Sequence, residues 1–200
     1  MSTEAPSFEP LLQFWLGDPG GDPLANSRRW FATDPAFDAE VRERFGALLA
    51  HGERGALESW RATPRGSLAY VILHDQIPRN VFRGTRGAFK LDARALEATR
   101  VAMARGFEDA LGPIERWFLY MPLMHAEDLD CQERCVEAFT RLAHETTGPV
   151  QEAVRQSLGF AEHHRAIIAR FGRFPHRNTS LGRTFTAEEL EFLQAEGAVP

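Results

Sequence analysis

Apolar residues recur three and four positions apart along almost the whole chain, and this spacing limits the fold more than any other feature. After Asp34, the apolar side chains of Phe37, Val41, Phe45 and Leu49 fall on one face of a predicted helix. Asp is a favoured N-cap residue, so the helix is expected to begin there. No run of alternating apolar and polar residues, and no Asn-Gly or Asp-Gly turn, indicates a hairpin. The sequence therefore predicts an all-α fold.

The same spacing, together with helix-breaking residues, predicts the other helices. The stretch "RGSLAYVILHDQIP", residues 65–78, has few β-branched side chains and is predicted to be a buried helix that ends at Pro78. Thr186 and Glu189 have the spacing of a capping box at the start of the last helix. Further helices are expected over residues 88–105, 113–121 with an interruption at Pro122, 127–144 and 150–171.

The length of 200 residues suits one domain, and we expect residues 1–200 to form a single all-helical domain. Successive helices joined by short loops predict an antiparallel helical array, either a tetratricopeptide-repeat-like superhelix or an irregular bundle. The start of the chain lacks the basic and apolar regions of a secretory signal, and the longest apolar run, residues 68–73, is too short to span a bilayer. We therefore expect a cytoplasmic protein that has no membrane segment.

Charge is distributed unevenly along the chain. The net charge of −5 argues against nucleic acid as a partner. No acid occurs between Glu162 and Glu188, where five arginines lie, or between Asp75 and Asp92, where three arginines and one lysine lie. Arginines near helix ends are typical of phosphate and carboxylate sites, so these two gaps indicate where an anion would bind.

Two loops within these gaps resemble each other. The segments "PRNVFRGT", from Pro78, and "PHRNTSLGRT", from Pro175, both place Arg-Asn after a buried helix. If the loops meet in space, they would form one basic, amide-rich surface for an anionic small molecule or an acidic peptide. The predicted ligand-binding residues are Gln76, Arg79, Asn80, Arg83, His164, Arg173, Arg177, Asn178 and Arg183.

A third polar segment is "MPLMHAEDLDCQE", residues 121–133. A histidine near carboxylates is a typical general acid–base pair, and the catalytic candidates are His125, Glu127, His176 and Asp75. Hydrolysis or phosphoryl-group chemistry would suit such a pair, although no nucleophile elbow or phosphate-binding loop occurs. No motif indicates a metal or a particular cofactor, and Cys131 and Cys135 are expected to be small buried side chains on one helix.

The same polar residues also have a purely structural interpretation. Arg, Asn, His and carboxylate side chains at helix ends often cap carbonyls and pair with each other. Three interpretations are therefore open: a binding module for an anion or acidic peptide, an enzyme that uses a histidine–carboxylate pair, and a structural polar network in a protein-interaction scaffold.

Four segments in order resemble an uncharacterised bacterial family catalogued as domain of unknown function nine-two-four: "LQFWLGD", "LAYVILHDQIPRNVFRGTRGAFKLD", "FLYMPLMHAEDLDCQE" and "HRAIIARFGRFPHRNTSLGRTFTAEEL". The resemblance implies an all-α, tetratricopeptide-like fold and no particular activity. His74 and Ile77 replace the more usual Leu and Phe of the family pattern. Because the shared motif residues are largely polar, the resemblance favours a ligand site over a purely structural network.

Overall fold

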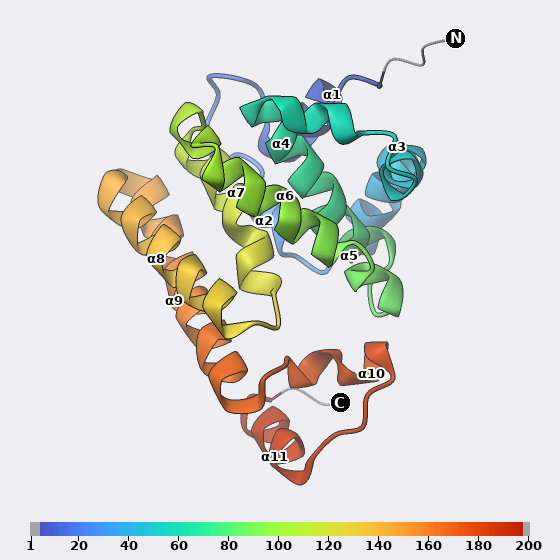
Figure 1. Ribbon diagram of the computed structural model, residues 1–200, viewed down its shortest axis with the longest axis vertical. Coiled ribbons are helices and arrows are strands. Elements are labelled where there is room, and N and C mark those ends of the chain that lie inside the picture. Colours follow the sequence, from blue (N-terminus) through green and yellow to red (C-terminus); the bar gives the residue numbers. More distant parts are fainter. Residues whose placement is uncertain (1–4, 198–200) are drawn as a thin grey trace.

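A computed structural model describes residues 5–197 of the chain (Figure 1). Its α-helices are α1 (Glu9–Leu16), α2 (Ser27–Trp30), α3 (Pro35–Glu53), α4 (Pro64–Val71), α5 (Ile77–Val81), α6 (Asp92–Ala104), α7 (Pro113–His125), α8 (Leu129–Glu145), α9 (Gly148–Phe171), α10 (Asn178–Leu181) and α11 (Ala187–Ala195). Short 3-10 turns cover Glu58–Ala62, Arg86–Phe89, Phe107–Ala110 and Pro175–Arg177. No β-strand occurs within residues 5–197, and the prediction of an all-α array is confirmed. Its tetratricopeptide-like character stays a prediction.

The apolar faces of the helices from α1 to α9 meet in one core. The residues that the helical spacing of α3 assigned to one face, Phe37, Val41, Phe45 and Leu49, are all buried in it. Large aromatic side chains fill the centre, where the ring of Trp15 meets another ring edge-on. Burial of such large apolar side chains is the main term that stabilises a fold of this size.

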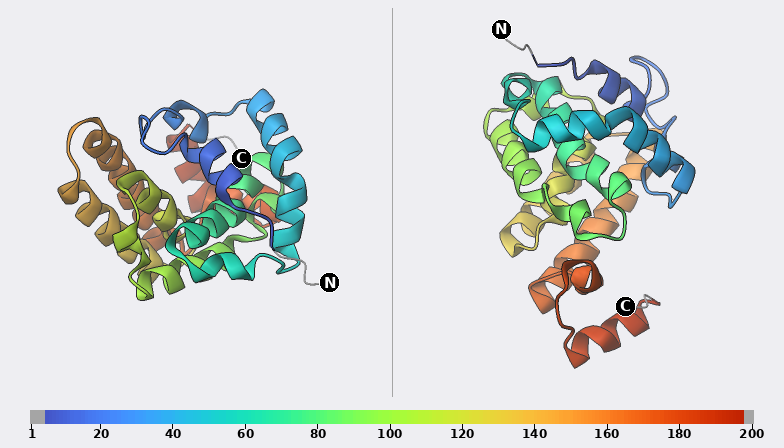
Figure 2. Two further views of the ribbon diagram at one scale, coloured as in Figure 1. Left: turned by 90° about the horizontal axis from the view of Figure 1, so that it is seen from above. Right: turned by 90° about the vertical axis from the view of Figure 1, so that its right-hand side faces the viewer.

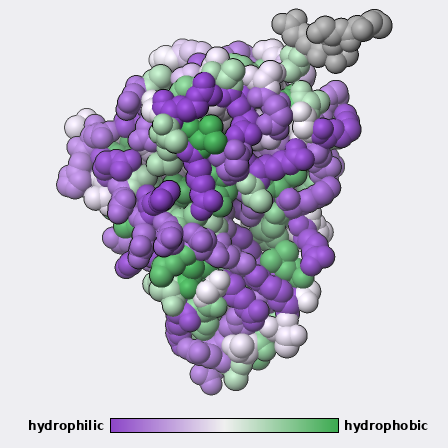
Figure 3. Space-filling model, viewed as in Figure 1, coloured by the Kyte–Doolittle hydropathy of each residue, from purple (hydrophilic) through white to green (hydrophobic). Residues whose placement is uncertain are grey.

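The helices α8 and α9 lie side by side and antiparallel along one flank, and α7 packs against both (Figure 1). Cys131 and Cys135 are one turn apart on α8, and both are buried free thiols, as the sequence predicts. Hydrophilic residues predominate on the face shown in Figure 3, where the hydrophobic residues form separate small patches. Within residues 5–197, no helix has the length and apolar character needed to cross a membrane.

The C-terminal segment projects from the end of α9 as a small unit of its own (Figure 2). Gly172 ends α9 with φ +68°, a left-handed conformation that glycine adopts without steric cost. Phe174 is extended before Pro175 and packs on Ile167 and Ile168 in a small apolar cluster of the described chain. The capping box predicted at Thr186 is confirmed at the start of α11.

Two prolines that were predicted to stop helices lie inside continuous helical paths instead. After α4 the chain makes one π-helical turn, Ile72–Gln76, and runs directly into α5, with Pro78 in the first turn of α5. The wider turn accommodates a residue that lacks an N–H and whose ring would clash with an α-helical carbonyl. Pro122 lies within α7, three residues before the helix ends at His125, so the helix lacks one hydrogen bond near its C-terminal end.

The helix predicted over residues 88–105 also begins later than expected, at Asp92. The hydroxyl of Thr85 accepts from the backbone N–H of Gly87 and caps a separate 3-10 turn, Arg86–Phe89, ahead of it. This later start places Asp92 in the first turn of α6, where it contacts Arg79.

Candidate active site

The π-helical turn between α4 and α5 carries Asp75 into the interior, where its side chain has 0% solvent exposure. Nε2 of Gln76 donates to Oδ2 of Asp75 at 2.6 Å, and Nη1 of Arg79 lies 3.3 Å from Oδ1. The Arg79 guanidinium also donates to the backbone carbonyl of Asp75. A buried carboxylate requires partners of this kind, and π-helical turns are frequent at functional sites.

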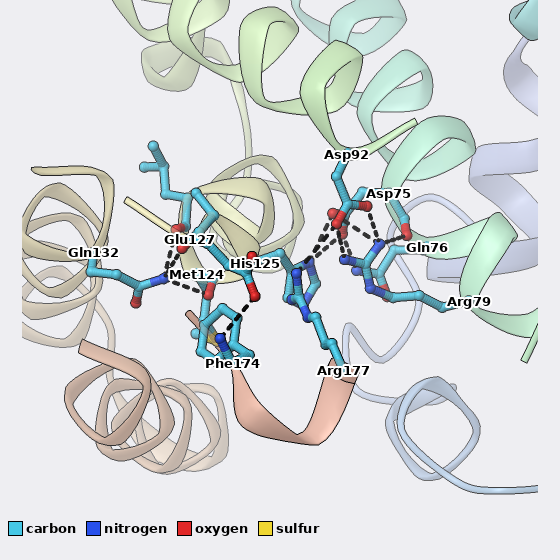
Figure 4. A network of polar contacts seen from close by, with 12 residues as sticks. Asp75, Gln76, Arg79, Asp92, Met124, His125, Glu127, Gln132, Phe174 and Arg177 are labelled. Atoms are coloured by element: carbon cyan, nitrogen blue, oxygen red, sulfur yellow. Dashed lines mark hydrogen bonds and ion pairs between the residues drawn. The ribbon is translucent and has the colours of Figure 1, made fainter. Parts of the chain in front are cut away.

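His125, the last residue of α7, is the third partner of this carboxylate (Figure 4). Its Nδ1 lies 2.8 Å from Oδ1 and 3.0 Å from Oδ2 of Asp75. Burial acts to raise the pKa of Asp75, but the positive charge of Arg79 and the contact with His125 outweigh it and hold that pKa below its ordinary value. The ionised carboxylate can accept but not donate, so Nδ1 carries the hydrogen and Nε2 of the neutral ring has a free lone pair.

The charge state of the ring follows from its surroundings. Burial, and next the positive charge of Arg79, lower the pKa of His125 below its ordinary value, although the Asp75 carboxylate acts in the opposite direction. The ring is therefore neutral at pH 7. A neutral imidazole with a fixed tautomer is suited to accept a proton through Nε2.

A second carboxylate connects two arginines beside this pair. Both terminal nitrogens of Arg79 donate to Asp92 at 3.0 Å, whereas Nη1 of Arg177 lies 3.7 Å from Oδ2 of Asp92. The Arg177 guanidinium lies between two rings, 4.8 Å from the centre of Phe89 and 4.5 Å from that of Phe174. Its Nε is buried and has no hydrogen-bond partner within residues 5–197. Burial, and next the charge of Arg79, lower the pKa of Arg177 to about 10, so it is still a cation at pH 7.

Two hollows adjoin the ring of His125. The first, which we call the polar pocket, has a volume of about 410 Å³ and is lined by Phe89, Asp92, Ala93, Leu96, Pro122, His125, Ala126, Glu127, Asp128 and Arg177. The second, which we call the apolar groove, has a volume of about 400 Å³ and is lined by Phe31, Trp117, Met121, Met124, His125, Ala153, Gln156, Ser157, Phe160 and His164. Both volumes are in the range of small-molecule sites.

The two arginine-rich loops meet, because Oγ of Ser180 donates to the carbonyl of Gly84 and Arg86 donates to the carbonyl of Leu181. They do not form one open basic surface, however. Acids from other parts of the chain lie against the predicted arginines and neutralise most of them. The two stretches that contain no acid in the sequence are therefore neutralised in the fold by acids from other parts of the chain. The sequence alone does not show this.

Asp38 on α3 is one of these acids. Arg83 donates to its two carboxylate oxygens at 2.7 and 2.8 Å, and Asn80 donates to the same carboxylate at 2.8 Å. These contacts, of which the Arg83 hydrogen bond is the largest cause, lower the pKa of Asp38. Arg83 and Asn80 are thus turned toward α3 and are absent from the lining of both hollows.

Glu189 neutralises the C-terminal loop in the same way. Arg173 donates to its two oxygens at 2.6 and 2.9 Å, and Asn178 donates to it at 3.2 Å. Its carboxylate also accepts from the N–H of Thr186, which completes the capping box of α11. A different acid, Glu127, pairs with Arg183, which donates to both of its carboxylate oxygens at 2.7 and 2.9 Å.

The predicted catalytic candidates therefore fall into two groups. His125 and Asp75 are in direct contact, whereas Glu127 is occupied by an arginine and by the backbone N–H of Phe174. The ring of His176 lies 5.4 Å from that of Phe174 and has no carboxylate partner in the described chain. Of the four possible histidine–carboxylate combinations, His125 with Asp75 is the pair that the fold assembles.

His164, predicted as a ligand-binding residue, lies on α9 at the wall of the apolar groove. Its ring meets Phe174 edge-on at 5.1 Å, and its buried Nδ1 has no partner within the part of the chain that the structure describes. Burial, followed by repulsion from His125 and His176 when these rings take up protons, lowers the pKa of His164 to about 3. His164 is thus a neutral imidazole with one unsatisfied nitrogen.

Sequence reasoning missed Asp92, Phe89 and the acid Asp38. Asp92 was visible only as the residue that closes an acid-free gap, and its position in the first turn of α6 depends on where that helix begins. In the described range 5–197, no group of three or more His, Cys, Asp or Glu side chains is arranged to hold a metal ion.

The fold and the site define an all-helical protein with a buried histidine–carboxylate–arginine network between two hollows. The chain belongs to the family described as "Bacterial protein of unknown function (DUF924)", whose sequence profile matches residues 11–197. It is similar to the solved "Structure of Protein of Unknown Function ATU0120 from Agrobacterium tumefaciens", with 34% identity and a TM-score of 0.78. The match covers 94% of this chain and 97% of the Agrobacterium chain. No curated protein matches the sequence.

Proposed function

We propose that the polar pocket is an active site in which His125 acts as the general acid–base group and Asp75 positions it. The observation that carries this proposal is the 2.8 Å contact between Nδ1 of His125 and the fully buried Asp75 carboxylate. It supports a ring whose tautomer is fixed and whose Nε2 is free to accept a proton. The His125 side chain is 13% exposed and borders two hollows, so a small substrate has access to it.

The lining of the polar pocket favours hydrolysis by an activated water. Among the described residues that line the pocket there is no Ser, Thr or Cys, the side chains that most often act as hydroxyl or thiol nucleophiles. In ester hydrolysis, Nε2 of His125 would take a proton from water while the water oxygen bonds to the carbonyl carbon or phosphorus. The same nitrogen would then return the proton to the oxygen of the departing alcohol.

Of the acids that line the polar pocket, Asp92 is paired with Arg79 and Glu127 with Arg183. Against this background, Arg177 supports an anionic substrate for the reaction. Other predicted arginines are held by carboxylates in forked pairs, whereas Arg177 has one long contact, of 3.7 Å, and a free Nε. A carboxylate or phosphate group in the polar pocket would receive a charge-assisted hydrogen bond from it. The volume of about 410 Å³ favours a small molecule over an acidic peptide.

The test is a panel of chromogenic carboxylic and phosphate esters, assayed with the wild type, with His125→Gln and with His144→Gln. His144 is exposed near the end of α8, so its substitution is the matched control. Loss of a general acid–base group lowers kcat/KM by about 10²- to 10⁴-fold, and this loss is expected for His125→Gln alone. Equal hydrolysis of every ester by the wild type and His125→Gln would exclude the proposal.

A binding role without catalysis is the second candidate, and the unsatisfied Arg177 is the observation that favours it. Titration with inorganic phosphate, followed by the thermal midpoint of unfolding, measures it directly. A rise in the midpoint that Arg177→Met abolishes, combined with no ester hydrolysis, would favour binding over catalysis. No rise in either protein would exclude phosphate binding at Arg177.

A further inference from the structure

We infer that the apolar groove holds the apolar part of the substrate, which makes the substrate a small amphiphile. Its alkyl or aryl chain would lie between α7 and α9, and its polar group would lie at His125. The identity of the reacting group rests on the proposed function, whereas the chain-binding role rests on the groove itself.

The walls of the groove are apolar and come from separate elements. Trp117, Met121 and Met124 extend from α7, and Phe160 extends from α9. Phe160 is 62% exposed although it borders a hollow whose lining is largely apolar. Methionine side chains adapt to ligands of different shape, which suits them to line a site for a flexible chain.

Phe31 adds a second exposed phenylalanine to the lining of the groove. Phe31 follows α2 and stacks on Trp117, with ring centres 6.1 Å apart and planes at 22°. Phe31 is 57% exposed, so this contact, and not burial in the core, orients its ring. Two exposed phenylalanines that flank one hollow form a surface from which a bound chain would displace water.

The chemistry of the lining indicates what kind of group binds there. The groove is lined by no Asp, Glu, Lys or Arg side chain of the described residues. A charged group would lose its hydration in the groove without gaining an ionic partner, whereas a hydrocarbon chain would not. The polar residues include His125 and His164, and the buried Nδ1 of His164 has no protein partner to bond with.

His125 lines both the apolar groove and the polar pocket. Because its ring lines both hollows, a chain in the groove and an anionic group near Arg177 would leave the bond between them beside that ring. The substrate class that fits both hollows is therefore an ester of a short or medium alkyl or aryl acid or alcohol that also carries a negative charge.

Binding can be tested without turnover. Acetate, butanoate, hexanoate and octanoate would be titrated into protein with ¹³C-labelled methionine methyl groups, and octanamide would show whether the charge is needed. The signals of Met121 and Met124, which line the groove, should shift, while that of Met103 on α6 serves as the internal reference. Each added methylene removes apolar surface from water, so the affinity should rise about three- to fourfold per methylene until the groove is full.

Two variants assign the effect to the groove. Ala153→Trp fills the groove with a large side chain. Phe160→Ser removes an exposed wall of the groove without opening the core, so this second variant keeps the test valid if Ala153→Trp prevents folding. Ala166→Trp places the same ring on an exposed position of α9 and is the control. Chain-length dependence should be lost in the first two variants and kept in the third.

The outcomes separate this inference from the proposed function. If His125-dependent ester hydrolysis occurs but affinity does not depend on chain length, the inference is wrong and the proposed function stands. If octanoate shifts Met121 and Met124 but no ester is hydrolysed, the groove is a binding site and the proposed function is wrong. If no fatty acid shifts the methyl signal of Met121 or Met124, in the wild type or in Phe160→Ser, the groove does not bind an alkyl chain and an amphiphilic substrate is excluded.

Discussion

Arg79 donates to both carboxylate oxygens of Asp92, each at 3.0 Å, and it also lies 3.3 Å from a carboxylate oxygen of Asp75. One guanidinium thus compensates two acids in the interior. Arg177 lies 3.7 Å from the same Asp92, at which Arg79 already provides a forked pair. The two arginines share a carboxylate but differ in how far the fold depends on each.

Substitution by methionine should separate these roles. Arg79→Met removes a partner of the buried Asp75 carboxylate and of the partly exposed Asp92 carboxylate, and it should lower the free energy of unfolding by about 3 kcal/mol. Arg177→Met should change it by no more than about 1 kcal/mol, because an apolar chain fits between Phe89 and Phe174 and no acid loses its main partner. Equilibrium unfolding in urea measures both values. An equally large loss for Arg177→Met would assign Arg177 to the structural network.

The Asp75 carboxylate should control the titration of His125. Its charge acts to raise the pKa of His125 against burial and the charge of Arg79, so Asp75→Asn should lower that pKa further. The substitution should also lower the free energy of unfolding by about 2 kcal/mol, because Arg79 loses one of its two carboxylates. An NMR titration of the His125 ring measures the pKa directly.

Asp130→Asn makes the same chemical change at an exposed position in the first turn of α8, and it is the control for Asp75→Asn. The His125 titration should be the same in this control and in the wild type. A His125 pKa that stays constant or rises in Asp75→Asn would show that the contact does not set the state of the ring.

Local signals in the sequence predicted the helices whose ends are marked by capping residues, such as Asp34 and Thr186. They also predicted His125 and Asp75 as candidates, but they left open which carboxylate meets the histidine. That pairing joins residues 50 positions apart, and its outcome depends on how α7 packs beside the turn after α4. No local signal in the sequence marked the π-helical turn at Asp75 either, and such turns are rare.

The partners in the ion pairs also could not be predicted from the sequence. Arg83 meets an acid 45 positions away, and Arg79 meets one 13 positions away. The acid-free gaps predicted a basic surface because charge was counted along the chain, whereas the fold places Asp38 and Asp92 into those gaps.

A glycine on α3 allows the helix to approach the turn that carries the site. A Cβ atom at Gly52 would lie 2.7 Å from Nε2 of His74, whose ring is fully buried and stacks on Tyr70 at 3.9 Å. The ring has no room to move, so Gly52→Ala should lower the free energy of unfolding by about 1–3 kcal/mol. Thermal or urea unfolding measures the loss.

Gly46→Ala is the matched substitution on the same helix, where a Cβ would meet no atom within 4 Å. It should raise the free energy of unfolding by about 0.5–1 kcal/mol, because alanine loses less conformational entropy in a helix than glycine does. If both substitutions stabilise the protein, the close approach to His74 has no energetic consequence.

Stability should fall in mild acid because His164 resists protonation in the folded protein. Burial, followed by repulsion from His125 and His176 when these rings take up protons, holds its pKa at about 3, far below the ordinary value of about 6.5. Between these values the unfolded chain binds a proton that the folded chain does not. The contribution of His164 is therefore complete above about pH 6.5 and is lost as the pH falls toward 3.

One proton taken up on unfolding corresponds to about 1.4 kcal/mol per pH unit. The free energy of unfolding of His164→Gln should therefore fall less steeply than that of the wild type between pH 6.5 and pH 5, by up to about 1 kcal/mol per pH unit. Urea unfolding at several pH values measures the two slopes, and His144→Gln shows what the loss of an exposed imidazole does by itself. If the free energy of unfolding changes equally with pH in His164→Gln and the wild type, His164 is protonated in the folded protein. Its unsatisfied Nδ1 would then be a charged donor at the wall of the apolar groove.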